Sequence, residues 1–241
     1  MPKNQNKLEQ VNTVDIDKIS IITQSGLDVS LMDPTVFGQL NIFEDIYSNV
    51  LSGNILIKDG TNFVSEAAIC GQEHLHVRWK TPGRDKVTDI TFQIFKISQR
   101  TEVEQKNIKL YTFHFISLEG IKNSTTRIDQ HYSTSIENIV KDVFNNYLRN
   151  DDIPKELIDV ERTRDRVAVT VPGWKPLKLI NWLCRRSISE TYGNADYLFY
   201  ETVNGFHFIS CAALAKQEVV QNYIQSPLPI RPIDDERVHE L

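Results

Sequence analysis

The sequence lacks the features that mark several large classes of protein. Its 241 residues include only 3 cysteines, and no apolar run approaches the roughly 20 residues that a membrane-spanning helix needs. Cys70, Cys184 and Cys211 are too few and too scattered for a disulfide framework, so we expect reduced core thiols. Because the N-terminus also lacks a signal-peptide core, we expect a soluble protein made in a cytosol.

Positive charge is also scarce. The chain has 27 Lys and Arg against 32 Asp and Glu, a net charge of −5, and no long basic run. A general affinity for nucleic acid or anionic lipid is therefore not expected, since such binding depends on clustered cations.

Catalytic signatures are absent as well. The sequence contains no G-x-S-x-G, no H-E-x-x-H and no phosphate-binding loop. What it does contain, 40% hydrophobic and 24% charged residues, is enough for a substantial core and two modest domains.

The first half alternates apolar and polar residues in the manner of an antiparallel sheet with one covered face. Between the strands at 53–58 and 74–79, the segment from Phe63 to Ile69 is expected to cross an open end of the sheet as one or two helical turns. Bulky side chains on both faces of the last strand favour either a central position for it or a position at an interface with another layer or subunit. The expected strands, about seven and typical of a small barrel or sandwich, are 16–23, 27–31, the region 37–46, 53–58, 74–79, 87–98 and 108–118.

The second half changes to a mixed pattern. Thr134 to Glu137 predicts a capping box, followed by an amphipathic helix from Ile136 to about Arg149. A short strand over 167–171 leads to a second helix, Leu177 to about Ser189, with Pro176 in its first turn.

A β-hairpin is expected after the second helix. Asn204-Gly205 predicts a type I′ turn that places Val203 opposite Phe206 and Glu201 opposite Phe208.

These patterns predict an α+β protein with four parts. They are a flexible N-terminal arm (1–14), a tube-like antiparallel β-barrel domain (15–125), a smaller α+β module with two helices and a β-hairpin (126–215), and an extended C-terminal segment (216–241).

Three sets of residues that contain histidine are candidates for a metal or catalytic site. Cys70, His74 and His76 resemble metal ligands, but a structural zinc site needs four, so surface histidines and a buried thiol are the default interpretation. His114 in its aromatic strand fits a core or interface histidine better than a catalyst. Glu201 and His207 are expected on opposite faces of the hairpin, which weakens them as an acid–base pair.

Other polar and aromatic sets have equally plain interpretations. Arg162, Arg164 and Arg166 could hold an anion but fit a solvated rim better. The dispersed Asp and Glu residues leave a glycosidase pair to be assembled by the fold, if at all. The aromatic residues of the hairpin could stack bases or sugars, but at strand spacing they favour a core or subunit interface; they are Tyr197, Phe199, Tyr200, Phe206 and Phe208. We therefore assign no catalytic, cofactor-binding or metal-binding residue.

Several packing phrases resemble the baseplate hub proteins of contractile-tailed bacteriophages. They are Leu51-Ser52-Gly53-Asn54-Ile55-Leu56-Ile57-Lys58-Asp59, Gly71-Gln72-Glu73 before a strand, Val171-Pro172-Gly173-Trp174-Lys175-Pro176-Leu177 with Trp182, and Phe199-Tyr200-Glu201-Thr202. The resemblance covers roughly residues 16–210 and extends more distantly to tail-tube and spike-base domains of contractile injection systems.

This resemblance implies a structural virion protein without enzymatic activity or cofactor. A homotrimeric ring would join the hexameric tail tube to the central spike in the tail baseplate, after synthesis in the host cytoplasm. Such hubs usually carry two tube-like barrels per chain, and this sequence shows one. Either the chain is a fragment of a longer hub protein that would continue into a second barrel, or another subunit completes the ring.

Two other classes of function stay open at this stage. A cell-wall carbohydrate-acting tail enzyme would need a cleft with converging carboxylates. A generic β-type module for a ligand or peptide would be a monomer with one deep pocket.

Overall fold

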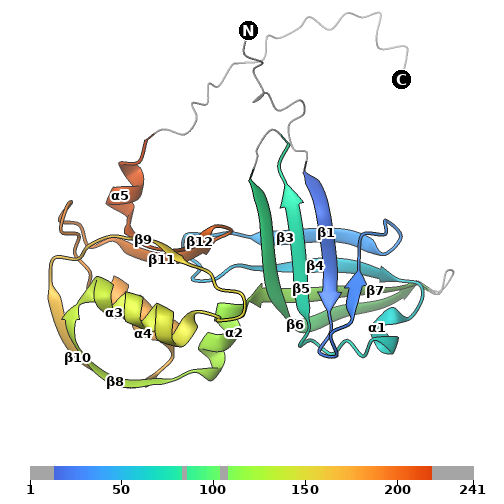
Figure 1. Ribbon diagram of the computed structural model, residues 1–241, viewed down its shortest axis with the longest axis horizontal. Coiled ribbons are helices and arrows are strands. Elements are labelled where there is room, and N and C mark those ends of the chain that lie inside the picture. Colours follow the sequence, from blue (N-terminus) through green and yellow to red (C-terminus); the bar gives the residue numbers. More distant parts are fainter. Residues whose placement is uncertain (1–13, 83–85, 104–107, 219–241) are drawn as a thin grey trace, which may run out of the picture.

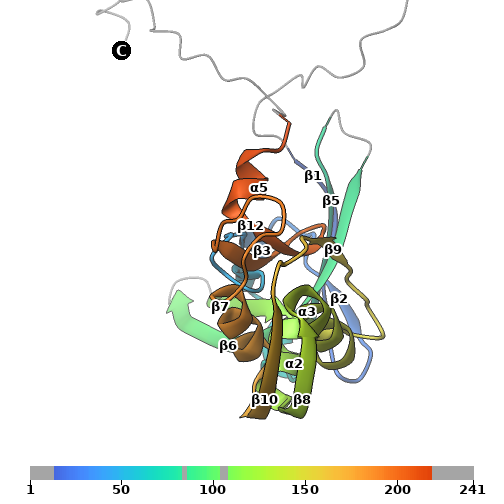
Figure 2. The ribbon, with the colours of Figure 1, turned by 90° about the vertical axis from the view of Figure 1, so that its left-hand side faces the viewer.

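The computed structural model describes residues 14–82, 86–103 and 108–218 (Figure 1). Their buried apolar side chains form two hydrophobic cores. The first draws its buried residues from between Ile19 and Phe115, and the second from between Ile128 and Phe208. Figure 1 shows the two halves beside one another, with the strand-rich half built from β1 to β7, and Figure 2 shows the second half in front of the first.

The first half is a seven-stranded antiparallel sheet in the order β2-β1-β5-β6-β7-β4-β3. It curls so that β1 and β5 cross in front of β3, β4 and β7 (Figure 1). The strands are β1 (Asp15–Ile22), β2 (Asp28–Ser30), β3 (Phe37–Phe43), β4 (Ser52–Asp59), β5 (His74–Lys80), β6 (Val87–Val103) and β7 (Ile108–Ser117). The predicted set of seven strands is confirmed, and β7 lies between β6 and β4 as its two bulky faces indicated.

The long strand β6 explains the curl. Its first part, Val87 to Gln93, pairs with β5, and the part from Phe92 to Val103 pairs with β7. The register with β7 shifts between Ile94 and Lys96 and again between Ser98 and Thr101. Such bulges bend and twist a strand, which allows one strand to serve two crossing parts of the same sheet.

Alternation in β4 works as the sequence predicted, with Gly53, Ile55 and Ile57 buried. Gly53 is required by close packing. A Cβ there would lie 2.1 Å from the Asn41 backbone oxygen and 2.4 Å from Cζ of Phe115. Only glycine lets β3, β4 and the Phe115 ring approach this closely.

The Asp59 carboxylate organises the start of the short helix α1 (Phe63–Glu66). It accepts hydrogen bonds from the backbone N–H groups of Thr61 (3.1 Å), Phe63 (3.0 Å) and Val64 (3.1 Å), although Asp59 is only 1% exposed. The buried carboxylate thus satisfies backbone donors that the first turn of α1 leaves free.

We expect Asp59→Asn to lower the free energy of unfolding by about 1–3 kcal/mol. The three backbone N–H groups now donate to both carboxylate oxygens, whereas an amide offers them only one acceptor oxygen. The measurement is urea unfolding. Asp33→Asn is the matched control, since the exposed Asp33 caps only the Thr35 N–H and hydroxyl and should change stability by less than about 0.5 kcal/mol. Equal losses in both variants would contradict this account.

The described residues of the second half form four α-helices, a π-helical turn and two small sheets around a core of their own. Its elements are α2 (Leu118–Thr125), β8 (Ile128–Ser135), α3 (Ile136–Val143), the π-helical turn η1 (Phe144–Leu148), β9 (Leu157–Val160), β10 (Arg166–Trp174), α4 (Pro176–Cys184), β11 (Tyr197–Thr202), β12 (Gly205–Ser210) and α5 (Cys211–Ala215). β8 pairs with β10, and β12 lies between β11 and β9, parallel to β9. The sequence patterns did not predict α2, β8 or β9.

The helices differ from the predictions at their ends. α3 gives way to η1 after Val143, and α4 ends at Cys184 rather than near Ser189. The predicted capping box is wrong. The Ser135 side chain makes no capping hydrogen bond, and the Glu137 carboxylate accepts instead from the backbone N–H and hydroxyl of Thr163. A tertiary partner thus takes the carboxylate that a local motif would have used.

The hairpin is present, but its predicted register is wrong by two residues. Glu201 lies opposite Phe206, and Thr202 lies opposite Gly205. Gly205 has φ +144°, and a Cβ there would lie 2.6 Å from the Glu156 backbone oxygen. The glycine is needed where β12 passes the chain beside β9, so it belongs to the strand and not to the turn.

The predicted α+β class is confirmed: a curled antiparallel sheet is followed by a smaller part that contains helices. The N-terminal arm up to residue 13 and the C-terminal segment from residue 219 lie outside the described residues. Among the described helices, none has the length and apolar character needed to cross a membrane.

Candidate functional site

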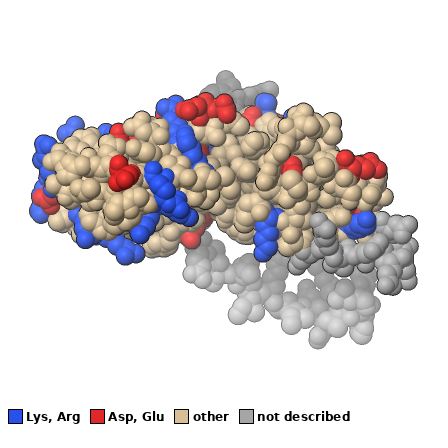
Figure 3. Space-filling model, turned by 90° about the horizontal axis from the view of Figure 1, so that it is seen from below, with Lys and Arg blue, Asp and Glu red and all other residues tan. Residues whose placement is uncertain are grey.

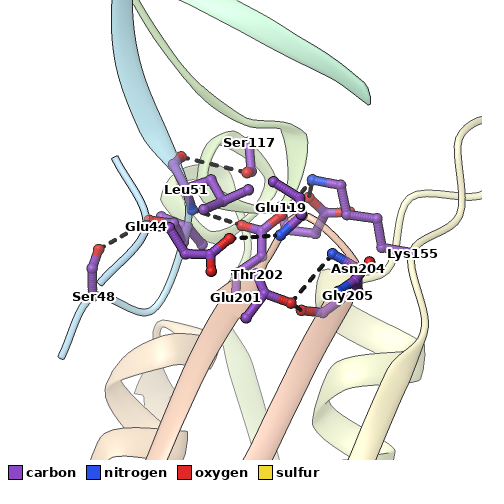
Figure 4. Close-up of polar contacts among 12 residues, drawn as sticks. Glu44, Ser48, Leu51, Ser117, Glu119, Lys155, Glu201, Thr202, Asn204 and Gly205 are labelled. Carbon is purple, nitrogen blue, oxygen red and sulfur yellow. Dashed lines mark hydrogen bonds and ion pairs between the residues drawn. The ribbon is translucent and has the colours of Figure 1, made fainter. Parts of the chain in front are cut away.

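A charged cluster is buried where the two halves meet. Glu119 lies in the first turn of α2, Glu201 lies on β11, and Lys155 precedes β9 (Figure 4). The Lys155 ammonium contacts a Glu119 carboxylate oxygen at 3.3 Å and donates a short hydrogen bond to Glu201. Both glutamate side chains are 0% exposed and that of Lys155 is 13% exposed, so one cation lies between two enclosed carboxylates.

The cluster is tied to the barrel backbone through Leu51. The second oxygen of Glu201 accepts from the Leu51 N–H at 2.8 Å (Figure 4). The Leu51 carbonyl accepts from the Ser117 N–H at 3.0 Å and from the Ser117 hydroxyl at 3.4 Å, and Figure 4 draws the hydroxyl contact. One residue of the barrel is therefore held both by its own sheet and by a side chain of the second half.

Two neighbouring contacts join the same pair of surfaces. The Asn49 amide donates to the Phe199 carbonyl at 2.7 Å, and Asn49 exchanges hydrogen bonds with the Asn181 side chain. The Glu44 carboxylate accepts from the Val203 N–H at 3.0 Å. The loop between β3 and β4 is thus fixed to α4 and to the β11–β12 hairpin.

The charge balance of the cluster is uneven. Burial raises the pKa of the Glu119 carboxyl, the Lys155 charge opposes this rise, and the Glu201 charge adds to it. Glu119 Oε1 is buried without a hydrogen-bond partner. Because two carboxylates share one ammonium, Glu119 is the member of the cluster least favoured in its ionised form.

A pH-dependent effect follows for Glu119→Gln. A carboxyl with a raised pKa in the folded state contributes stability below its unfolded pKa, and this contribution is lost as pH rises through the folded value. The variant should therefore gain stability over the wild type at pH 8, with a smaller difference at pH 5. Urea unfolding at both pH values measures this, and a variant no more stable than the wild type at pH 8 would refute it.

The carboxylate pair is enclosed by the surrounding chain. Glycosidase chemistry needs two carboxyl groups that flank a bound sugar. Here both side chains are 0% exposed, and their oxygens contact Lys155 and the Leu51 N–H. The arrangement can hold two parts of the chain together but offers no access for a polysaccharide.

The structure gives the candidate metal ligands other partners. Cys70 is exposed rather than buried, and its hydrogen bond to Glu73 raises the pKa of its thiol. His76 pairs with Asp89 at 2.6 Å. In the described part of the chain, no three His, Cys, Asp or Glu side chains are arranged to hold a metal ion.

All three cysteines are free thiols, as expected, but only Cys184 lies in a core. That thiol is buried, and burial raises its pKa to about 12. Cys211 is partly exposed.

The two other candidate histidines, His114 and His207, interact with neighbouring side chains. His114 and Ser98 share a hydrogen bond of 2.7 Å between Nε2 and Oγ. His207 lies opposite Tyr200, so it faces away from Glu201 as predicted, and it pairs with Asp159 at 2.7 Å.

For the arginines and the hairpin aromatics, the structure fits the structural interpretation better than the binding interpretation. Arg162, Arg164 and Arg166 are all exposed, as a solvated rim requires. All five hairpin aromatics are buried, and four of them belong to the second core. Rings stack within that core, for example Phe199 on Phe206 at a centroid distance of 5.6 Å.

Sequence reasoning missed the charged cluster. Glu119 follows an apolar strand directly, and this is a weak signal that its side chain is covered. Lys155 lies in a polar stretch between Pro154 and Glu156 and carries no signal at all. Its position between two carboxylates depends on contacts across 36 and 46 residues of sequence.

The comparisons with known proteins bear on the fold. No protein-family model and no curated protein matches the sequence. Among solved structures, the chain is similar to the crystal structure of the 43 kDa tail protein of prophage MuSo2 from Shewanella oneidensis, with a TM-score of 0.53 and 10% identity over 80% of this chain and 54% of that one.

Two further structures have lower scores. A Francisella PdpA-VgrG complex in its half-lidded form gives a TM-score of 0.49 at 12% identity, covering 85% of this chain and 33% of that one. The tail protein from Neisseria meningitidis MC58 gives 0.46 at 9% identity, covering 79% and 49%. Neither score is high enough to support an argument.

The chain thus spans about half the length of the solved tail protein that it matches. At 10% identity the likeness bears on the fold alone. At that level the resemblance found in the sequence is confirmed: this chain has the fold of a phage tail protein.

Proposed function

We propose that this chain is a structural component of a contractile phage tail, a baseplate hub subunit that joins the tail tube to the central spike. The observation that carries the proposal is the shared fold, which covers 80% of this chain. The proposed partners are the tube and spike proteins, and the proposed assembly is a homotrimeric ring within the virion.

The junction between the two cores supports a mechanical role. A hub must transmit load between tube and spike without bending between its parts. The cluster of Glu119, Lys155 and Glu201 joins the two halves through buried, charge-assisted contacts, which are stronger than exposed ones. The same enclosure argues against a reaction at these carboxylates, so we propose that the protein is not an enzyme.

The net charge of the chain suits a conduit for DNA. The chain as a whole carries a net charge of −5. On the face shown in Figure 3, Lys and Arg side chains gather over one half of the molecule, and broad uncharged areas cover much of the rest. Because the whole chain has no excess of cations to replace the counterions of DNA, DNA could pass without strong adhesion.

The domain division proposed from the sequence is kept in this function. Residues 15–125 would form the tube-like unit and residues 126–215 the accessory unit. Residues 1–14 and 216–241 would serve as an arm and an outgoing segment. We also propose that a second barrel comes either from a longer chain or from another subunit.

Mixing experiments test the proposal. The purified chain is combined with the tube and spike proteins of the same tail, and the masses are measured by analytical ultracentrifugation. We expect a species that contains three chains of 27.8 kDa together with both partners. A mixture in which the chain stays a monomer and binds neither partner would refute the hub assignment.

A second assay addresses catalysis. Incubation with purified cell walls should produce no clearing and release no soluble sugar. Release of sugar that is abolished by Glu119→Gln or Glu201→Gln would place chemistry at the cluster after all.

A further inference from the structure

The two edge strands of the seven-stranded sheet, β2 and β3, differ in length and in charge. At one end lies β2, which has three residues and is flanked by the ion pair of Lys18 and Asp28 at 2.6 Å. At the other lies β3, which has seven residues and pairs on one side only, with β4, among the described strands. Short length and charge protect a sheet edge against pairing with another chain, and only the β2 end has both.

The composition of β3 leaves its edge open. Its sequence, Phe-Gly-Gln-Leu-Asn-Ile-Phe, contains no charged residue and no proline. Phe37, Leu40 and Ile42 lie opposite core residues of β4, yet they remain only partly buried. An edge of this kind presents unpaired backbone groups next to apolar side chains that nothing among the described residues covers.

An apolar groove runs beside this edge. It has a volume of about 260 Å³ and is lined by Val14, Ile16, Phe37, Leu40, Ile42, Val77 and Trp79. The upper ends of β1 and β5 extend past β3 (Figure 1). Residues from this region, Val14, Ile16, Val77 and Trp79, line the groove together with the three β3 residues. Every lining residue is apolar, and the first core is open to solvent here.

Exposed apolar side chains also occur at the end of β3 and in the loop that follows. Phe43, the last residue of β3, is 54% exposed, and Ile46 and Tyr47 in the following loop are 41% and 78% exposed.

We propose that the free edge of β3 accepts an extended, uncharged segment of another polypeptide as an eighth strand of the sheet. Backbone hydrogen bonds along β3 hold the segment, and its alternate apolar side chains enter the groove under Val14, Ile16 and Trp79. An extended strand fits both features at once. A helix has no free backbone groups along its length to pair with β3, and a small apolar ligand would use the groove but leave the edge unpaired. This binding site does not require the proposed tail role, because it depends only on the free edge of β3 and the apolar groove beside it.

The test uses a synthetic probe on the full chain. The probe is a fluorescein-labelled peptide of alternating threonine and valine with a lysine at each end. Binding is followed by fluorescence anisotropy, and amide hydrogen exchange locates it. We expect saturable binding with slower exchange of the amides within Phe37–Phe43.

Two exposed aliphatic residues provide matched variants. Val14 (49% exposed) lines the groove, whereas Leu27 (54% exposed) lies in the turn between β1 and β2. Val14→Asp should weaken peptide binding by about tenfold, because the added carboxylate must be desolvated as the strand enters. Leu27→Asp should leave the affinity unchanged.

N-methylated peptides test for strand pairing itself. Methyl groups on one alternate set of residues remove the backbone donors of one strand edge only. One methylated set should abolish binding and the other should not.

Four results would overturn the proposal: no binding at millimolar peptide, exchange protection outside β3, equal effects of the two aspartate variants, or equal effects of the two methylated sets. Concentration-dependent protection of β3 without peptide would assign the edge to a second copy of the chain instead.

Discussion

Lys155→Met should lower the free energy of unfolding by about 3–5 kcal/mol, the range for breaking a buried ion pair by removing one partner. The variant keeps the length and apolar stem of the side chain but leaves Glu119 and Glu201 without their cation. Both carboxylates are 0% exposed, so water cannot take its place. Urea unfolding monitored by tryptophan fluorescence measures the loss.

The control for this prediction is Lys18→Met. Lys18 forms an equally short ion pair with Asp28, but the two side chains are 38% and 47% exposed. Exposed pairs contribute about 0–1 kcal/mol. Similar losses in the two lysine variants would show that burial at the junction does not matter.

A triple variant separates charge from packing. Combining Lys155→Met with Glu119→Gln and Glu201→Gln removes every formal charge from the cluster. Because an uncompensated buried charge costs more than a neutral polar group, the triple variant should be more stable than Lys155→Met alone. The opposite order would mean that the lysine acts through packing.

Gly53→Ala should lower the free energy of unfolding by about 3 kcal/mol, at the upper end of the range for overpacked cores. The new methyl group would lie 2.1 Å from the Asn41 backbone oxygen and 2.5 Å from Cε2 of Phe115. Neither obstacle is the end of a flexible side chain. To relieve the clash, β3 must move away from β4 or the Phe115 ring must leave its fully buried position.

Gly60→Ala is the matched control for Gly53→Ala. The nearest heavy atom to a Cβ at Gly60 is Cγ1 of Ile108, at 3.9 Å, and Gly60 does not have a positive φ. We expect a change within about 0.5 kcal/mol of the wild type. Thermal unfolding of the two variants compares them directly, and a comparable loss at Gly60 would point to glycine flexibility rather than to packing at Gly53.

These effects bear on the proposed function. A loss of stability at Lys155 that also uncouples the unfolding of the two cores would show that the cluster is what joins them. A hub variant of this kind should fold in part but fail to assemble with tube and spike. Retained assembly with a broken junction would argue that load does not pass between the two cores.

The local pattern determined much of the barrel. Alternation of apolar and polar side chains is a property of neighbouring residues, so β1, β4, β5 and β7 were predicted close to their observed bounds. The same is true of the absence of charge from β3 and of the buried aromatic face of the β11–β12 hairpin, both of which can be read from consecutive residues.

What the tertiary structure alone decided involves partners far apart in sequence. The hairpin register shifted because β12 must pass close to Glu156, and the capping box did not form because Thr163 took the Glu137 carboxylate. The charged cluster formed because folding brought Lys155 to carboxylates 36 and 46 residues away. Local patterns fix strand identity because side-chain direction repeats every two residues, whereas register, capping and burial of charge depend on which distant groups compete for the same atoms.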